Sequence, residues 1–215
     1  KRVELVKNIR LESNRIGTRK SAAFPYKFGE IRYQEKDSII IPETSSENRA
    51  YVPIGFLSSK YVISNSAFGL YNFETWIFSI LTSKMHMAWM KRVSGRLRKD
   101  FRYSNTLVYN TFPFPNISKQ RKEELTQCTL RILDERLKHS EKTLAQLYDP
   151  DKMPEGLKEA HHQNDLAIER CYRSTPFNSD EERLEYLFKL YEKMIQEEKD
   201  KDTLFAKEKK TRKRK

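Results

Sequence analysis

An apolar helix pattern that runs directly into a basic strand pattern constrains the fold most. Residues 73–93 place apolar side chains at steps of three and four, the spacing of one buried helix face. These side chains are Trp76, Ile77, Ile80, Leu81, Met85, Ala88 and Trp89. Gly95 is the expected end of the helix, since glycine accepts the left-handed conformation that closes one. Residues 101–110 then alternate as a strand does, so this part should pack a long helix against a sheet.

Strand patterns precede this helix. Residues 26–33 and 38–41 are the first two, and Pro42 stops the second. Residues 51–57 and 61–64 are rich in β-branched and aromatic side chains, and the short polar link between them predicts a hairpin. Residues 65–72 form either a further strand or a turn. Pro113 and Pro115 end the last strand because neither can donate to a ladder, which predicts a domain boundary at residues 112–118.

Helical patterns dominate after this boundary. Leu125, Cys128 and Ile132 mark one face of a first helix. A loop is expected at residues 144–154, and its last residue, Pro154, suits the first turn of a second helix. Ser179 opens a third helix as the start of an S-x-x-E capping-box pattern. The predicted class is therefore α+β: a mixed sheet with a long packed helix, followed by an all-α helical domain.

Four segments follow from these patterns. Residues 1–20 are basic, with apolar residues on one helix face, and are expected to form a connector helix. Residues 21–115 form the α+β domain, and residues 116–198 form the helical domain. Residues 199–215 are almost all charged and are expected to be disordered.

The charge is distributed unevenly along the chain. The net charge is +12 overall, with +10 in residues 1–115, −4 in residues 116–206 and +6 in residues 207–215. A basic first half favours a polyanion such as DNA or RNA. A solvated basic surface without a partner is the alternative. On the first interpretation, the acidic helical half faces away from the nucleic acid or braces the domain that binds it.

The sequence argues against several other classes of protein. Cys128 and Cys171 form neither a disulfide framework nor a zinc pattern, and a reducing cytoplasm fits buried thiols. No apolar run approaches the roughly 20 residues of a membrane span, so no membrane partner is expected. The start, KRVELVKNIR, has no initiator Met and no apolar signal core, as expected of a fragment of a longer protein.

Catalytic and cofactor motifs are also missing from the sequence. It has no glycine-rich nucleotide loop and no NPPY-type tetrapeptide of an adenine methyltransferase. His161 and His162 are adjacent and would point to different helix faces, so a metal site is not expected. His86 is interpreted as a core or interface residue. The acidic loop around Asp149 is interpreted as a helix-capping connection, and this chain is expected to bind no cofactor and no metal.

The basic run after Gly95 contains side chains that can form hydrogen bonds with the edges of bases. Arginine presents two parallel donors that match guanine O6 and N7, and aspartate accepts from a cytosine amino group. Alternate residues of a strand point the same way, so Arg98, Asp100 and Arg102 should share one face. An acid between two arginines is odd on a purely phosphate-binding surface. Asp100 would therefore read a base or orient the arginines, and a plain intramolecular salt bridge is the alternative.

Several longer motifs carry a resemblance to a known family. The runs MHMAWM, SGRL and FRYSNTLVYNTFPFP resemble the C-terminal part of MmeI-like restriction–modification enzymes, as does SSENRAYVPIGFL. LAQLYDPDKMPEGLKEAHHQNDLAIERCY and the run at residues 176–191 resemble the helical C-terminal domain of that family. The similarity spans about residues 21–195. These are single-chain enzymes that combine an endonuclease, an adenine-N6 methyltransferase and a target-recognition part.

The resemblance implies that the chain is a sequence-specific, non-catalytic module for double-stranded DNA, whose methyltransferase and endonuclease domains lie upstream. It implies S-adenosylmethionine and Mg²⁺ for the full-length enzyme, and the cytoplasm of a prokaryote as its location. Positions after the GRL tripeptide would help to read bases, and a second reading position would fall near Asn65 and Ser66. Asn48 and Arg49 match a motif of the family, and either a contact with the DNA backbone or a structural role in the loop would explain them.

The candidate residues fall into two groups. Those expected to read bases are Arg98, Asp100, Arg102, Asn65 and Ser66. Those expected to contact the DNA backbone are Asn48, Arg49, Lys60, Lys91, Arg92, Arg96, Lys99 and Ser104. Two other functions remain open: a protein-interaction subunit that docks through the helical half, and an RNA-binding module that uses the aromatic strands.

Overall fold

The structure is a computed structural model that describes residues 1–29 and 31–212, and its packing divides the chain after Glu35. The first unit contains α1 (Arg2–Leu11), α2 (Ile16–Lys20) and the 3₁₀ turn η1 (Ser21–Ala23). Arg10 holds this unit together by donating to the carbonyls of Ser21, Phe24 and Lys27 at 2.6–2.9 Å. The single connector helix expected at residues 1–20 is thus a pair of helices.

The strand expected at residues 26–33 is wrong for the residues described there, 26–29 and 31–33. They form turns and irregular backbone instead. A strand needs a neighbour for its backbone N–H and C=O groups. The described residues of this unit form only helices, turns and irregular backbone.

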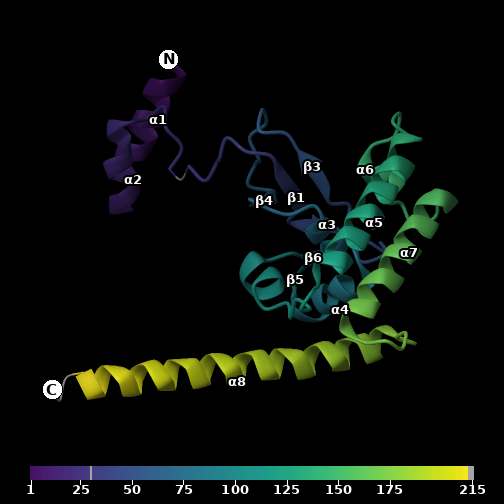
Figure 1. Cartoon of the computed structure of the whole chain (residues 1–215). Helices are drawn as coiled ribbons and strands as arrows, with labels where there is room; N and C mark the ends of the chain where they lie inside the picture. Colours follow the sequence, from purple (N-terminus) through teal and green to yellow (C-terminus); the bar gives the residue numbers. More distant parts are fainter. Residues whose placement is uncertain (30, 213–215) are drawn as a thin grey trace. The chain divides into compact units, whose positions relative to one another are not determined.

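Two small antiparallel sheets form the α+β part of the second unit (Figure 1). In the first, β1 (Ser38–Pro42) lies between β3 (Gly55–Leu57) and β4 (Ala67–Tyr71). In the second, β6 (Asp100–Arg102) lies between β2 (Thr44–Ser45) and β5 (Gly95–Leu97). The α+β class is confirmed, but these two antiparallel sheets stand where one mixed sheet was expected.

The hairpin expected between residues 51–57 and 61–64 does not form. β3 pairs with β1 instead, with Ile39 opposite Phe56, and residues 61–64 are irregular. The strand-or-turn alternative at residues 65–72 is resolved as a turn at Asn65-Ser66 followed by β4. Ile39 of β1 is fully buried at the centre of the sheet. This burial favours β1, and not residues 61–64, as the pairing partner of β3.

The long helix expected at residues 73–93 is interrupted. α3 (Trp76–Leu81) ends at Thr82, and α4 (Lys84–Val93) begins after Ser83. The Ser83 hydroxyl donates to the Ile80 carbonyl at 2.7 Å and accepts from the His86 N–H at 3.3 Å. One serine therefore both closes the first helix and caps the second, the local competition with helix geometry typical of this residue.

Gly95 does not end α4 in the way expected. The helix stops because Ser94 is extended, with ψ 152°, and Gly95 already belongs to β5. Positive φ angles occur at Asn72 and Arg98 within the described residues, and not at a glycine. The strand expected at residues 101–110 is also shorter. β6 ends at Arg102, and Ser104 caps a π-helical turn, η2 (Asn105–Tyr109).

The helical half consists of α5 (Lys119–Leu137), α6 (Leu144–Leu147), α7 (Glu155–Tyr172) and α8 (Asp180–Arg212). α6 lies inside the expected loop and has a full capping box formed by Thr143 and Gln146. Pro154 occupies the position just before α7. α8 continues through most of the tail that was expected to be disordered, and residues 213–215 lie outside the described residues.

The two halves of the second unit share one hydrophobic core. α5 packs beside α7, and the buried helices α3 and α4 pack against α5, α7 and α8 (Figure 1). Trp89 of α4 lies 5.1 Å from the Phe188 ring and 5.4 Å from the Tyr191 ring of α8. Within the described ranges, no helix is long and apolar enough to cross a membrane.

Candidate nucleic-acid interface

The two small sheets meet at Glu43, the residue between β1 and β2. Its N–H donates to the Ser66 carbonyl at 2.9 Å, and its carbonyl accepts from the Tyr103 N–H at 2.7 Å. Its carboxylate pairs with the Arg102 guanidinium at 2.8 Å. Two stretches expected to read bases, the Asn65-Ser66 turn and the end of β6, are thereby brought beside the same residue.

Sequence reasoning did not single out Glu43. It lies in a polar segment between the strand patterns at residues 38–41 and 51–57, and its partners are 23 to 60 positions away in the sequence. No local spacing indicates such an arrangement. The half-buried carboxylate nevertheless fixes the position of the exposed Arg102 side chain, which is expected to read a base.

The β5–β6 hairpin carries the other expected readers. Leu97 pairs with Asp100, so Arg98 and Lys99 form a tight two-residue turn, and Arg98 has φ 59°. Such turns require positive φ angles and favour Asn or Gly, so an arginine here is unusual. Arg98 therefore lies at the hairpin tip and not on the strand face that Asp100 and Arg102 share.

Among the described residues, the ion pairs around this hairpin do not involve Asp100. Arg102 pairs with Glu43, and Arg96 contacts Glu47 at 3.4 Å and the Lys99 carbonyl at 2.9 Å. The Arg96 guanidinium also lies 4.0 Å from the centre of the Phe101 ring, a cation–π contact. Arg96 thus stabilises the hairpin from one side, while Arg98 and Lys99 are exposed at its tip.

The second expected reading position, Asn65 and Ser66, forms the exposed turn before β4. The Ser66 hydroxyl lies 2.7 Å from that of Ser64. Together with the Glu43 contacts, this bond fixes the turn beside the sheet that carries β6. The structure therefore places the two expected reading stretches near each other, although more than thirty residues separate them in the sequence.

The residues expected to contact the DNA backbone are more dispersed. Lys91 pairs with Asp180 at the start of α8 at 3.2 Å, and Arg49 donates to the Ala145 carbonyl at 3.5 Å. Lys60 and Arg92 are exposed at separate places, and Ser104 caps η2. Of this group, Arg96 and Lys99 lie on the β5–β6 hairpin itself.

His86 and His161 are core residues, whereas His162 is exposed. His86 Nε2 lies 3.1 Å from the Tyr103 hydroxyl, and burial lowers the pKa of His86 to about 3. His161 Nε2 lies 2.6 Å from the Tyr148 hydroxyl, and burial lowers its pKa to about 3, with Arg136 adding to the effect. Both rings are neutral at pH 7. The interpretation of His86 as a packing residue is confirmed.

Within the described ranges, the two cysteines and the Asp149 loop have the surroundings of structural residues. Burial raises the pKa of Cys128 and Cys171, which disfavours the reactive thiolate. Among the residues that the structure describes, no group of three His, Cys, Asp or Glu side chains is placed to hold a metal ion. Asp149 Oδ1 instead accepts from the Asp151 N–H at 3.1 Å in the connection before α7.

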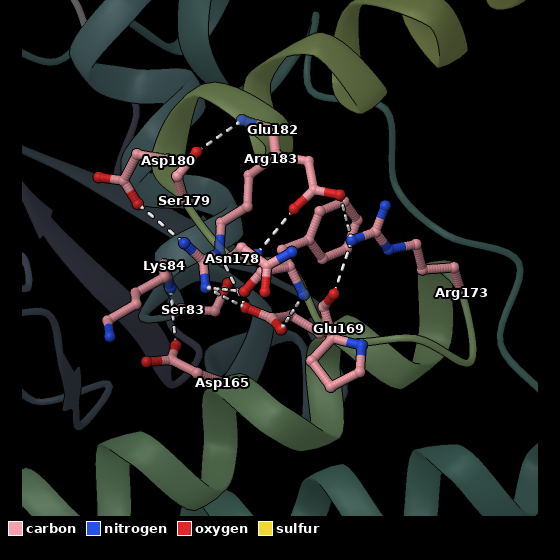
Figure 2. A network of polar contacts seen from close by, with 12 residues as sticks. Ser83, Lys84, Asp165, Glu169, Arg173, Asn178, Ser179, Asp180, Glu182 and Arg183 are labelled. Carbon is pink, nitrogen blue, oxygen red and sulfur yellow. Dashed lines mark hydrogen bonds and ion pairs between the residues drawn. The ribbon is translucent and has the colours of Figure 1, made fainter.

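A buried polar network ties the helical half to the start of α4 (Figure 2). Asp165 of α7 accepts from the Lys84 N–H and from the Tyr51 hydroxyl, both at 2.7 Å. Burial raises the pKa of Asp165 to about 6 against these two hydrogen bonds, which lower it. Nearby, Glu169 pairs with Arg183 of α8 at 2.6 Å. The helix that leads into the hairpin is thus held by α7 and α8.

The β5–β6 hairpin presents exposed basic side chains on a buried helical scaffold, an arrangement that favours a polyanion. Residues 1–116 match the family model described as MmeI, target recognition domain, and residues 117–197 match MmeI, C-terminal domain. The chain therefore belongs to the MmeI family, and it consists of that family's target recognition domain and C-terminal domain.

Two relatives agree with this assignment. DNA methyltransferase A of Bacillus subtilis (strain 168) is 46% identical over 195 residues, which cover 91% of this chain and 22% of the relative. The solved structure of the type IIL restriction–modification enzyme MmeI in complex with DNA matches with a TM-score of 0.87 and 39% identity. That match covers 90% of this chain and 26% of the enzyme. The chain thus spans about a quarter of the length of these relatives.

Proposed function

We propose that this chain selects a specific sequence in double-stranded DNA and holds it for catalytic domains located elsewhere in the parent protein. The observation that supports this most directly is the exposed β5–β6 hairpin, whose strand β6 is joined through Glu43 to the Asn65-Ser66 turn. Arginine, aspartate and amide side chains supply the donors and acceptors that distinguish base pairs in the major groove. A hairpin is narrow enough to enter that groove.

Arg98 at the hairpin tip is the leading candidate base reader, with Asp100 and Arg102 beside it on β6. Asn65 and Ser66 form the second reading position. Lys99 and Arg96 are the nearest candidates for the DNA backbone, and the exposed Lys60 and Arg92 are more distant ones. The parent protein would methylate adenine with S-adenosylmethionine and cleave DNA with Mg²⁺, in the cytoplasm of a prokaryote. The present chain would do neither.

Selection from a random duplex library tests the proposal. The purified chain should enrich one short base sequence, called the word below. Its affinity should fall as salt rises, since phosphate contacts release counterions. Arg98→Ala should relax the preference at one base pair at a cost of about 1–3 kcal/mol. Binding without any sequence preference, or stronger binding to RNA, would refute the proposal. S-adenosylmethionine-dependent methyl transfer by the isolated chain would refute its non-catalytic part.

A further inference from the structure

A pocket of about 310 Å³ lies where the loop after β2 meets α4 and α7. Its polar lining comes from three separate segments. Asn48 comes from the loop, Lys84 from the first residue of α4, and Lys158 and His162 from successive turns of α7. Tyr51 and Tyr148 supply apolar surface. The α+β part and the helical half of the second unit therefore both contribute to this pocket.

The ammonium groups of the pocket are only weakly paired within the protein. In the part of the chain that the structure describes, the Lys84 ammonium has no ion-pair partner. The neighbouring Asp165 carboxylate accepts from the Lys84 N–H and the Tyr51 hydroxyl, and the Lys84 charge lowers its pKa without a direct ion pair. Lys158 contacts Glu155 at 3.4 Å, but the Glu155 side chain is 88% exposed, so water and salt weaken this pair. Two lysines that face one pocket favour an anion between them.

The pocket is also connected to the reading hairpin. Glu47, the residue before Asn48, contacts Arg96 of β5. Lys84 begins the ten-residue helix α4, which leads through Ser94 into the same strand. At about 1.5 Å per residue, α4 places Lys84 about 15 Å from Ser94, where the chain enters the hairpin. This distance corresponds to roughly 4 or 5 base pairs of duplex at about 3.4 Å each.

We propose that this pocket seats one sugar–phosphate unit of the DNA strand that flanks the recognised word. Lys84 and Lys158 bind the phosphate, Asn48 and His162 lie at its rim, and the sugar lies against the tyrosines. The pocket volume exceeds what a phosphate alone would fill, and the apolar surface suits a deoxyribose. The proposal rests on the DNA binding proposed above, and it gives the acidic helical half a direct contact with DNA.

Methylphosphonate substitution, which neutralises one phosphate at a time, tests this inference on the selected duplex. The wild-type chain should lose affinity at one or two positions outside the word, roughly 4 or 5 nucleotides from the bases read by the hairpin. Lys84→Ala with Lys158→Ala should weaken binding about fivefold, as two partly exposed ion pairs would. The double variant should no longer respond to neutralisation at those positions, and its preferred word should be unchanged.

Lys138→Ala is the matched control, because Lys138 also forms an i,i+3 pair with a glutamate and lies outside the pocket lining. It should keep the wild-type profile. An unchanged profile in the double variant, with the word still selected, would overturn the phosphate pocket and leave the proposed function intact. A wild-type chain that selects no word would overturn both. Micromolar binding of a free deoxynucleoside monophosphate by calorimetry, lost in the double variant while the duplex profile stays unchanged, would assign the pocket to a free nucleotide and also overturn it.

Discussion

Asp165 should make the stability of the protein depend on pH in a direction opposite to that of most carboxylates. Its pKa is about 6 in the folded chain against 3.8 in the unfolded chain, chiefly because the carboxyl is buried. The folded state therefore binds the proton more tightly. The stability linked to this group is fully present below pH 3.8 and is lost as pH rises through about 6. At 1.36 kcal/mol per pKa unit, the loss amounts to about 3 kcal/mol.

Asp165→Asn removes this ionisation and keeps a side chain of similar shape. The difference in unfolding free energy, variant minus wild type, should rise by about 2.5 kcal/mol between pH 4 and pH 7.5. If the amide forms weaker hydrogen bonds than the carboxyl group, the difference shifts by the same amount at every pH. His86 and His161 have depressed pKa values of about 3, so their contribution is lost as pH falls below about 6.5. They are present in both proteins and cancel in the difference.

Urea unfolding followed by tryptophan fluorescence at several pH values measures this difference. Tyr51→Phe is the companion variant, because the Tyr51 hydroxyl lowers the pKa of Asp165. Without that hydroxyl the pKa should rise further, and stability should fall more steeply toward high pH. A flat difference between Asp165→Asn and wild type, or one that falls with pH, would refute the account of Asp165 as a destabilised buried acid.

Two further predictions concern the scaffold and the tail. Trp89→Ala should cost about 3–5 kcal/mol in urea unfolding, because the buried indole packs on two α8 rings, while Arg92→Ala on the exposed side should stay within about 0.5 kcal/mol. Deletion of residues 207–215, which carry a net charge of +6, should lower affinity and flatten its salt dependence in a binding titration. The selected word should not change, and a changed word would mean that the tail reads bases.

The helices were predictable where their packing face repeats regularly. Leu125, Cys128 and Ile132 are buried on α5 as their spacing indicated, and Ser179 accepts from the Glu182 N–H at 3.2 Å at the start of α8. The expected reciprocal bond differs, since the Glu182 carboxylate accepts from the Asn178 N–H at 2.7 Å. Such features depend on neighbours within one or two turns, so the sequence contains them directly.

The break at Ser83 escaped the same reasoning for a physical reason. Residues on both sides of it are buried, so the apolar periodicity continues across the interruption. The Ser83 hydroxyl breaks the helix through its bonds to Ile80 and His86. A serine inside an apolar pattern does not by itself indicate such a break. The short extent of β6 was missed similarly, because Ser104 caps a turn in the middle of an alternating pattern.

The site itself was predictable by residue type but not by arrangement. Arg98, Asp100 and Arg102 were expected on one strand face, yet the two-residue turn removes Arg98 from it. The approach of Asn65 and Ser66 to β6 depends on Glu43, whose contacts are long-range. The alternation of side chains every two residues describes a single strand. It does not indicate which turn of another sheet will lie beside that strand.

The contrast between Arg98 and Arg102 has a consequence for how specificity changes. Arg98 is exposed at a turn, so a single substitution there should alter one contact alone. Arg102 is already paired with Glu43 at 2.8 Å, and a change at either residue leaves the other charge without its partner. Arg102→Ala and Glu43→Ala should therefore be non-additive in DNA affinity, with a coupling energy on the order of 0.5–3 kcal/mol for residues in contact. The Arg98→Ala and Glu43→Ala pair should add within about 0.5 kcal/mol. Binding titrations on the selected duplex measure both cycles, and equal coupling in the two would mean that Glu43 does not position Arg102 for the DNA.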